Sequence, residues 1–232
     1  VQTQYPFRDT ITLKVRGKGE RFTLKFRIPQ WCQEPELTVC GEGWNTMRDE
    51  NGFVEVDRQW NNEDTVVLRL PMQIWWSKAE DANGKHPIVL ERGPLVYAKK
   101  IEANWKQTKD TGYTPLPEGW GWYEAVATSG QPHVDAQDRF DFNYALVEER
   151  LDEAKAQEQA YAYPWEDTPV KIVIFAEKAK GMFPPYPIKT PDLYENPIAT
   201  DKKTLPIELV PYGCTNLRIT YFPKADRGGE SV

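Results

Sequence analysis

Residues 11–28 read ITLKVRGKGERFTLKFRI, and this stretch is the most informative about the fold. Apolar and polar residues alternate from Ile11 to Val15 and again from Phe22 to Ile28, which is the period of a β-strand with one buried face. The glycine-containing segment Arg16–Glu20 separates the two runs. Pro29 ends the second run, because proline has no N–H for a strand ladder. The stretch therefore predicts a β-hairpin with one face in a core.

Further strands are predicted along the rest of the chain, at Leu37–Val39, Phe53–Val56, Val66–Met72, Ile88–Leu90, Leu95–Ala98, Asn143–Glu148, Val170–Ala176, Ile207–Val210 and Leu217–Phe222. Turn signals separate them, such as Asn51–Gly52, a dipeptide typical of two-residue hairpin loops. Strands do not alternate with helical patterns, which argues against a parallel α/β fold. We therefore expect an all-β fold of two β-sandwich domains, jelly-roll-like, with little helix.

The length of 232 residues fits two such domains better than one. From about residue 99 to residue 141 the periodicity disappears, over more residues than an ordinary loop contains. We therefore predict a first β-sandwich domain at residues 1–99 and a second at 100–223, with long aromatic and proline-rich loops, followed by a polar tail at 224–232. Within the second domain, the composition of Glu148–Ala160 favours a helix, although a helix that is polar all round is marginal.

Composition excludes several classes of protein. The formal net charge is −6, from 29 basic and 35 acidic residues, and this argues against a nucleic-acid partner, which needs clustered Lys and Arg. The apolar runs are only a few residues long, far short of the ~20 that a membrane-spanning helix needs. There is no G-x-S-x-G motif of the kind that carries a serine nucleophile.

The three cysteines, Cys32, Cys40 and Cys214, lack the close spacing of a zinc site. An odd count also excludes a complete disulfide framework. We expect buried or half-buried thiols that behave as small apolar groups. A disulfide between Cys32 and Cys40, or a metal site, stays open as an alternative.

Two carboxylates and two histidines are candidates for acid–base catalysis. Glycoside hydrolysis needs two carboxyl groups about 5–10 Å apart, and Glu124 and Asp141 are the most suggestive candidates. With 35 acidic residues, however, a pair can always be chosen, so solvated or salt-bridged carboxylates are the simpler interpretation. His86 and His133 lie in loop-like contexts without a recognisable partner, and we expect them to be solvated.

Aromatic residues are the strongest candidates for a binding role. The pair Trp75–Trp76 and the run that contains Trp120, Trp122 and Tyr123 could stack on sugar rings or pack between domains. The second group alternates with glycines and is flanked by loop-like residues. We therefore predict that it lies on a long excursion from the second domain, outside the core strands.

The chain also carries a series of motifs in a specific order. They are YPF at 5–7, LKFRIPQWC at 24–32, RQW at 58–60, LPM at 70–72, ERGPLVY at 91–97, FNYAL at 142–146, YPW at 163–165 and LVPYGCTNLRITYFP at 209–223. Together they resemble glycoside hydrolase family 127, the β-L-arabinofuranosidase-like family. The resemblance runs from Tyr5 to Pro223 and therefore covers nearly the whole chain.

The resemblance implies that only part of a longer enzyme is present. Proteins of that family have an (α/α)₆ barrel followed by two β-sandwich domains, and this chain resembles the sandwiches alone. The zinc-bound cysteine nucleophile and the glutamate acid/base of the family lie in the barrel, which would precede Val1. No catalytic residue, metal ligand or cofactor site can therefore be carried over to this chain. The resemblance also favours an extended conformation for Glu148–Ala160.

Three functions are compatible with the sequence. The chain is expected to be the non-catalytic β-sandwich portion of a glycoside hydrolase that acts on plant-type or other arabinose-containing glycans, and to pack against the catalytic barrel as its partner. The alternative is an autonomous carbohydrate-binding module. A third possibility is a complete small enzyme, but we expect no hydrolysis by this chain alone.

Overall fold

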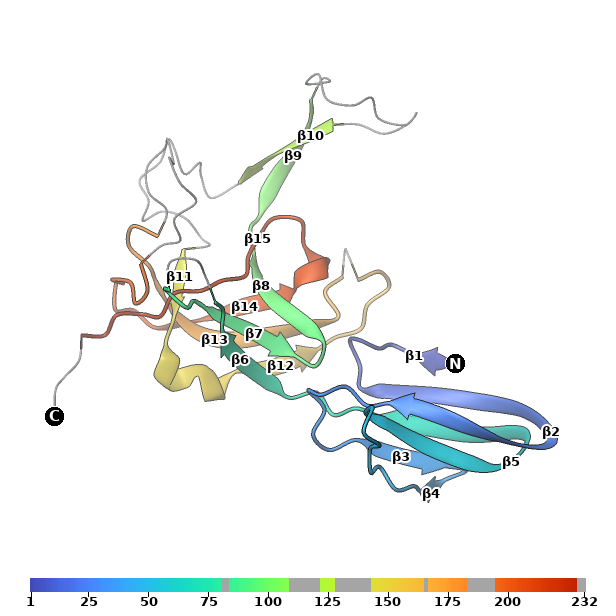
Figure 1. The fold of residues 1–232 in the computed structure, drawn as a ribbon. Helices are drawn as coiled ribbons and strands as arrows, with labels where there is room; N and C mark the ends of the chain where they lie inside the picture. Colours follow the sequence, from blue (N-terminus) through green and yellow to red (C-terminus); the bar gives the residue numbers. More distant parts are fainter. Residues whose placement is uncertain (81–83, 109–121, 128–142, 165–166, 183–194, 229–232) are drawn as a thin grey trace. The chain divides into compact units, whose positions relative to one another are not determined.

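The computed structural model describes residues 1–80, 84–108, 122–127, 143–164, 167–182 and 195–228, and for 122–127 only the course of the backbone (Figure 1). By their internal contacts the residues fall into two units. Unit 1 comprises Val1–Trp75 and Glu91–Leu95, and unit 2 comprises Trp76–Leu90 and Val96–Val232. The expectation of a mostly β chain with little helix is confirmed.

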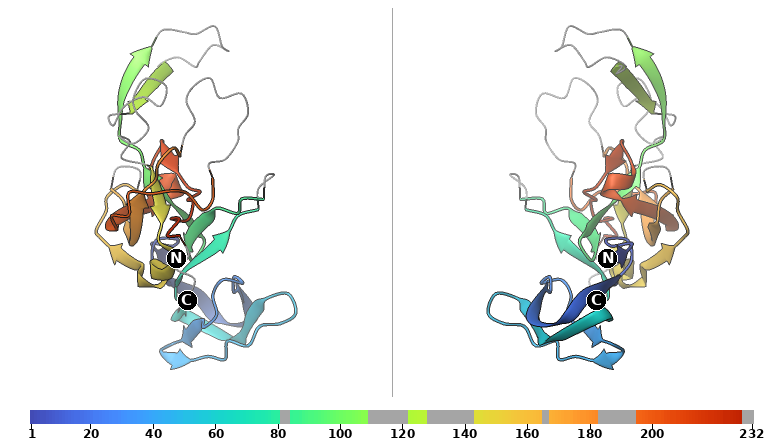
Figure 2. Two further views of the ribbon diagram at one scale, coloured as in Figure 1. Left: turned by 90° about the vertical axis from the view of Figure 1, so that its left-hand side faces the viewer. Right: turned by 90° about the vertical axis from the view of Figure 1, so that its right-hand side faces the viewer.

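Unit 1 is built on one antiparallel sheet of five strands, in the order β1-β2-β5-β3-β4. Their bounds are β1 Gln2–Thr3, β2 Thr10–Arg27, β3 Glu36–Val39, β4 Glu42–Gly43 and β5 Phe53–Arg69. The two long strands β2 and β5 run side by side, as the blue and cyan arrows of Figure 1 and the side views of Figure 2 show. The sheet therefore depends on one ladder between these two strands.

The hairpin predicted over residues 11–28 is wrong, because β2 runs through the whole stretch and both of its halves pair with β5. The register shifts between Val15 and Arg16 and again between Arg16 and Glu20. Gly19 has a φ of +92°, and a Cβ on Gly17 would lie 2.4 Å from the carbonyl oxygen of Trp60. The glycines thus form a bulge in a continuous strand, a feature with the same local composition as a turn.

The core of unit 1 lies on one face of this sheet. Along β5 the buried residues share one parity, as expected for alternating side chains, and Trp60 is fully buried. Its indole Nε1 donates to the carbonyl of Phe22 at 2.8 Å, and the two rings stack with centroids 5.7 Å apart. The cluster comprises Phe26, Ile28, Cys32, Leu37, Val39, Val54, Val56, Trp60, Val66, Leu68 and Leu70.

The largest sheet of the chain has the order β11-β13-β14-β8-β7-β6, with β12 beside β13 and β15 beside β8. The bounds are β6 Ile74–Lys78, β7 Ile88–Arg92, β8 Leu95–Lys100, β11 Tyr144–Leu146, β12 Lys155–Glu158, β13 Val170–Lys178, β14 Leu205–Pro211 and β15 Arg218–Ile219. Most predicted strands therefore exist. The strand expected at Leu217–Phe222 is interrupted, because β15 covers only Arg218 and Ile219, and Phe222 forms an isolated bridge with Ile88.

The C-terminal end of β13 carries a buried charge. Glu177 is 1% exposed, and its carboxylate accepts hydrogen bonds from Thr200 Oγ1 at 2.6 Å, Thr204 Oγ1 at 2.9 Å and Arg227 Nη2 at 2.6 Å. Burial alone would raise the pKa of Glu177, but these three donors outweigh it and hold the pKa below its usual value. The network ties the end of the described chain to the sheet.

Two segments differ in detail from the sequence-based expectations. Glu148–Ala160 begins with a 3₁₀ turn, η2, at Glu148–Glu153 and continues extended in β12, so the expected extended form holds for its second half. The start of the expected polar tail is not loose, since Lys224 bridges to Leu146 and Ala225 bridges to Ile198. The polar composition of this segment did not predict its pairing, because backbone hydrogen bonds between strands do not require apolar side chains.

The limits of the two units defined by contacts differ from the limits of the domains predicted from the sequence. Residue 99 lies inside β8, whose pairing with β14 and β15 accounts for the placement of Val96–Lys100 in unit 2. The limits 1–99, 100–223 and 224–232 concern domains that fold independently. Independent folding is a property of the isolated segments, so these limits stay a prediction.

Candidate binding site in unit 1

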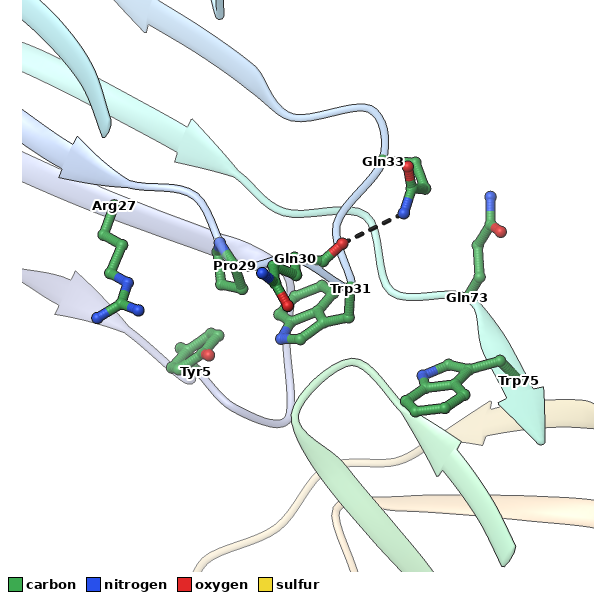
Figure 3. Close-up of a pocket in the computed structure, with 8 residues that line it drawn as sticks. All are labelled: Tyr5, Arg27, Pro29, Gln30, Trp31, Gln33, Gln73 and Trp75. Atoms are coloured by element: carbon green, nitrogen blue, oxygen red, sulfur yellow. Dashed lines mark hydrogen bonds between the residues drawn. The ribbon is translucent and has the colours of Figure 1, made fainter. Parts of the chain in front are cut away.

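A hollow of unit 1 has a volume of about 890 Å³. Its walls come from three segments that are distant in sequence: the loop before β2, the end of β2 with the loop that follows, and the approach to β6 (Figure 3). The lining residues are Tyr5, Arg27, Pro29, Gln30, Trp31, Gln33, Gln73 and Trp75. We call this hollow the aromatic pocket, after its three aromatic residues.

Two of the aromatic residues pack against the hydrophobic core of unit 1. Tyr5 and Trp31 are partly buried and pack against the core cluster of unit 1. Trp31 precedes Cys32, which is completely buried and whose carbonyl accepts a hydrogen bond from Arg48. The loop that carries Tyr5 is fastened by a hydrogen bond from its backbone N–H to Thr3 Oγ1 at 2.9 Å. These two rings therefore stand on a rigid base.

Trp75 supplies the most accessible aromatic surface of the pocket, with 40% of its area exposed. It lies on β6, where successive side chains point to opposite faces of the strand. The neighbouring Trp76 therefore points away, and it does not line the pocket. The predicted pair of tryptophans is thus divided, with Trp75 on the pocket face and Trp76 on the other.

Polar groups of the pocket lack partners within the described part of the chain. The indole nitrogens of Trp44 and Trp60 each donate to a backbone carbonyl, but those of Trp31 and Trp75 have no acceptor there. The side chains of Arg27, Gln30 and Gln73 likewise form no hydrogen bond with any described residue. The amide of Gln33 donates to the Gln30 carbonyl at 3.2 Å. The pocket therefore offers several donors and acceptors to a ligand.

The described lining of the pocket carries little charge. Among the described residues that line it, Arg27 alone is charged, and none is Asp or Glu. Burial raises the pKa of the Tyr5 phenol, so its hydroxyl stays protonated and can donate. The described lining thus holds no carboxylate pair to act as general acid and base in cleaving a glycosidic bond.

The second group of predicted aromatic residues is not part of the described pocket lining. Trp122 and Tyr123 belong to β10 (Trp122–Ala127), which pairs with β9 (Ala103–Thr108) in a separate two-stranded sheet. Trp120 falls outside the described residues. The proposed sugar-binding or interdomain role of this group stays a prediction.

The other candidates for chemistry are also dispersed. Cys32 and Cys214 are buried, as expected, but Cys40 is exposed, and all three are free thiols. The exposure of Cys40 has a local cause, because it occupies a left-handed turn position, φ +53°, rather than a strand. Over the described ranges, no group of three or more His, Cys, Asp or Glu could hold a metal ion.

None of the remaining acid–base candidates is among the described lining residues of the aromatic pocket. His86 lies in a loop of unit 2, where its carbonyl accepts from the Asn196 amide at 3.0 Å. Glu124 lies in β10, and Asp141 and His133 fall outside the described residues.

Sequence reasoning missed most of the aromatic pocket. Tyr5 and Trp31 stand in the quoted motifs YPF and LKFRIPQWC, but neither is beside Trp75 in the sequence. Only the folding of unit 1 places residue 5, residues 27–33 and residues 73–75 around one hollow. Of the lining residues, Trp75 alone was a candidate from the sequence.

Comparison with known proteins now bears on identity. Residues 1–72 match the family model described as β-L-arabinofuranosidase, GH127 middle domain. The resemblance carried by the sequence motifs is thereby confirmed for this segment. Six of the eight lining residues lie inside the matched segment, and Gln73 and Trp75 follow it directly.

Solved structures extend the likeness of fold to nearly the whole chain. A structure titled glycoside hydrolase superposes with a TM-score of 0.59 at 20% identity, over 97% of this chain and 32% of that one. A GH127 β-L-arabinofuranosidase from Geobacillus stearothermophilus gives 0.58 at 22% identity, over 96% and 30%. A GH127 β-arabinofuranosidase gives 0.59 at 17% identity, over 96% and 31%.

The chain therefore spans about a third of the length of these structures. No curated protein sequence matches it significantly. None of the helices in the described ranges is long and apolar enough to cross a membrane.

Proposed function

We propose that this chain is the non-catalytic β-portion of a β-L-arabinofuranosidase-like hydrolase of family GH127. The observation that carries the proposal is the match of residues 1–72 to the GH127 middle domain. The fold likeness over 96–97% of this chain, but only 30–32% of the solved structures, supports a piece of a larger enzyme. The substrates would be arabinose-containing glycans of plant or other origin.

Catalysis is assigned to another part of the protein. The described lining of the aromatic pocket includes no carboxylate, and the cysteines of this chain are far apart in sequence, with Cys32 and Cys214 buried. The donor set does not fit the zinc that the family resemblance implies, since the described residues form no metal-ligating group. A zinc ion and the catalytic groups would lie in the barrel domain that we propose as partner.

The direct test is an activity assay on the 232-residue chain. A chromogenic β-L-arabinofuranoside is incubated with the purified chain, with and without added zinc and a thiol reductant, and the release of the chromophore is followed. We expect the uncatalysed rate in both cases. Turnover by the chain alone would overturn the proposal and favour a complete small enzyme. A denatured sample of the same preparation serves as the control.

A further inference from the structure

We propose that the aromatic pocket is a sugar-binding site that holds a neutral oligosaccharide without cleaving it. The assignment of arabinofuranosyl residues as the preferred sugar rests on the proposed function, whereas the assignment to sugars rests on the pocket alone. The site would anchor a glycan chain on unit 1.

The first support is the arrangement of aromatic surfaces. Tyr5, Trp31 and Trp75 come from three segments and border one hollow (Figure 3). The face of an aromatic ring carries partial negative charge, and the C–H groups on the face of a sugar ring carry partial positive charge. Stacking therefore buries the apolar side of a sugar while its hydroxyls stay at the edge. With 40% of Trp75 exposed, its ring is open to such a ligand.

The second support is the set of polar groups at the rim. Sugar hydroxyls both donate and accept, and so do glutamine side-chain amides. Gln30, Gln33 and Gln73 all line the pocket, and the side chains of Gln30 and Gln73 have no hydrogen-bond partner within the described ranges. The indole N–H groups of Trp31 and Trp75 add two donors. Arg27 is the one charged side chain of the described lining, and its guanidinium N–H groups can donate to sugar hydroxyls.

Size and rigidity also agree with an oligosaccharide. The volume of about 890 Å³ lies within the range of roughly 300–1,000 Å³ that small-molecule sites occupy. Tyr5 and Trp31 rest on the buried core, so binding need not order them. Less conformational entropy is lost when the binding groups are held in place beforehand.

The test is calorimetric titration of the 232-residue chain with arabinofuranosyl oligosaccharides, and with gluco-oligosaccharides of equal length. The variant Trp75→Ala removes the exposed ring, and Gln73→Ala removes one amide. Trp76→Ala is the matched control, because Trp76 is 36% exposed on the other face of the same strand. Circular dichroism checks that each variant is folded.

We expect Trp75→Ala to weaken binding by about tenfold or more, which corresponds to ~1.4 kcal/mol. For Gln73→Ala we expect a loss of roughly threefold, as for one hydrogen bond between neutral groups. Trp76→Ala should leave the affinity unchanged. Binding of gluco-oligosaccharides alone, lost in Trp75→Ala, supports the pocket and contradicts the arabinose assignment. No binding of either sugar, or equal losses in Trp75→Ala and Trp76→Ala, would overturn the site, whatever the activity assay shows.

Discussion

Gly17 lies where the β2–β5 ladder changes register, and its replacement by alanine tests the fold of unit 1. A Cβ at residue 17 would lie 2.4 Å from the carbonyl oxygen of Trp60 and 2.8 Å from its carbonyl carbon. Both atoms belong to the backbone of the partner strand, so no side-chain rotation can relieve the contact. In the hairpin that the sequence predicted, residue 17 would lie in a loop and tolerate alanine.

The magnitude follows from two opposing effects. Inserting a methyl group into a packed site costs about 1–3 kcal/mol, and more where the backbone must move. Removing a glycine stabilises by about 0.4–1 kcal/mol, because the unfolded chain loses freedom. Since the obstacle here is backbone, we expect Gly17→Ala to lower the free energy of unfolding by about 2–3 kcal/mol. For a chain of this size that is a fall in Tm of about 4–12 °C.

Thermal unfolding of the two alanine variants Gly17→Ala and Gly43→Ala is the assay. Gly43 also lies in a strand, β4, but a Cβ there would meet nothing within 4 Å. We expect this control to keep or slightly raise the Tm. Equal Tm values for the two variants would refute the close approach of Gly17 to Trp60, and with it the continuous strand.

Two further predictions concern unit 2 and the thiols. The hydrogen bonds that Glu177 accepts outweigh the effect of its burial, so the pKa of Glu177 is lower in the folded chain than in the unfolded chain. The ionised carboxylate therefore stabilises the fold above the unfolded pKa, and this stabilisation is lost as the pH falls through the folded pKa. Arg227→Met should therefore lower the free energy of unfolding by about 1–2 kcal/mol at pH 7, a value that is discounted because Arg227 is partly exposed. In chemical denaturation the difference between the variant and the original chain should shrink below about pH 4. A difference that does not depend on pH would contradict this prediction. Under native conditions a thiol reagent should modify Cys40 alone, because Cys32 and Cys214 are buried and burial raises their pKa values. Mass spectrometry after proteolysis identifies the modified cysteines, and modification of Cys32 or Cys214 would contradict the prediction.

Strand content followed from the sequence because alternation and turn residues are local signals. Val170–Ala176, for example, was predicted as a strand and forms most of β13. Strand pairing was not predictable in the same way. Gly17 and Gly19 suit a turn and a bulge equally, and only the length of β5 selects the bulge.

The aromatic pocket was predictable in one residue only. Trp75 was a candidate because the face of a tryptophan can stack on a sugar ring. Tyr5 and Trp31 were quoted only as parts of motifs, and in the structure both also pack against the core. Their second role depends on three segments meeting in space, which a pattern along the chain does not encode.

The central proposal is that this chain is part of an arabinofuranose hydrolase whose catalytic groups lie outside it. The measurement that tests it most directly is the rate of arabinose release from a β-L-arabinofuranoside by the complete gene product, compared with the 232-residue chain at equal concentration. We predict steady turnover by the complete product and only the uncatalysed rate for the chain. A complete product that releases no arabinose, or a chain that matches its rate, would contradict the claim.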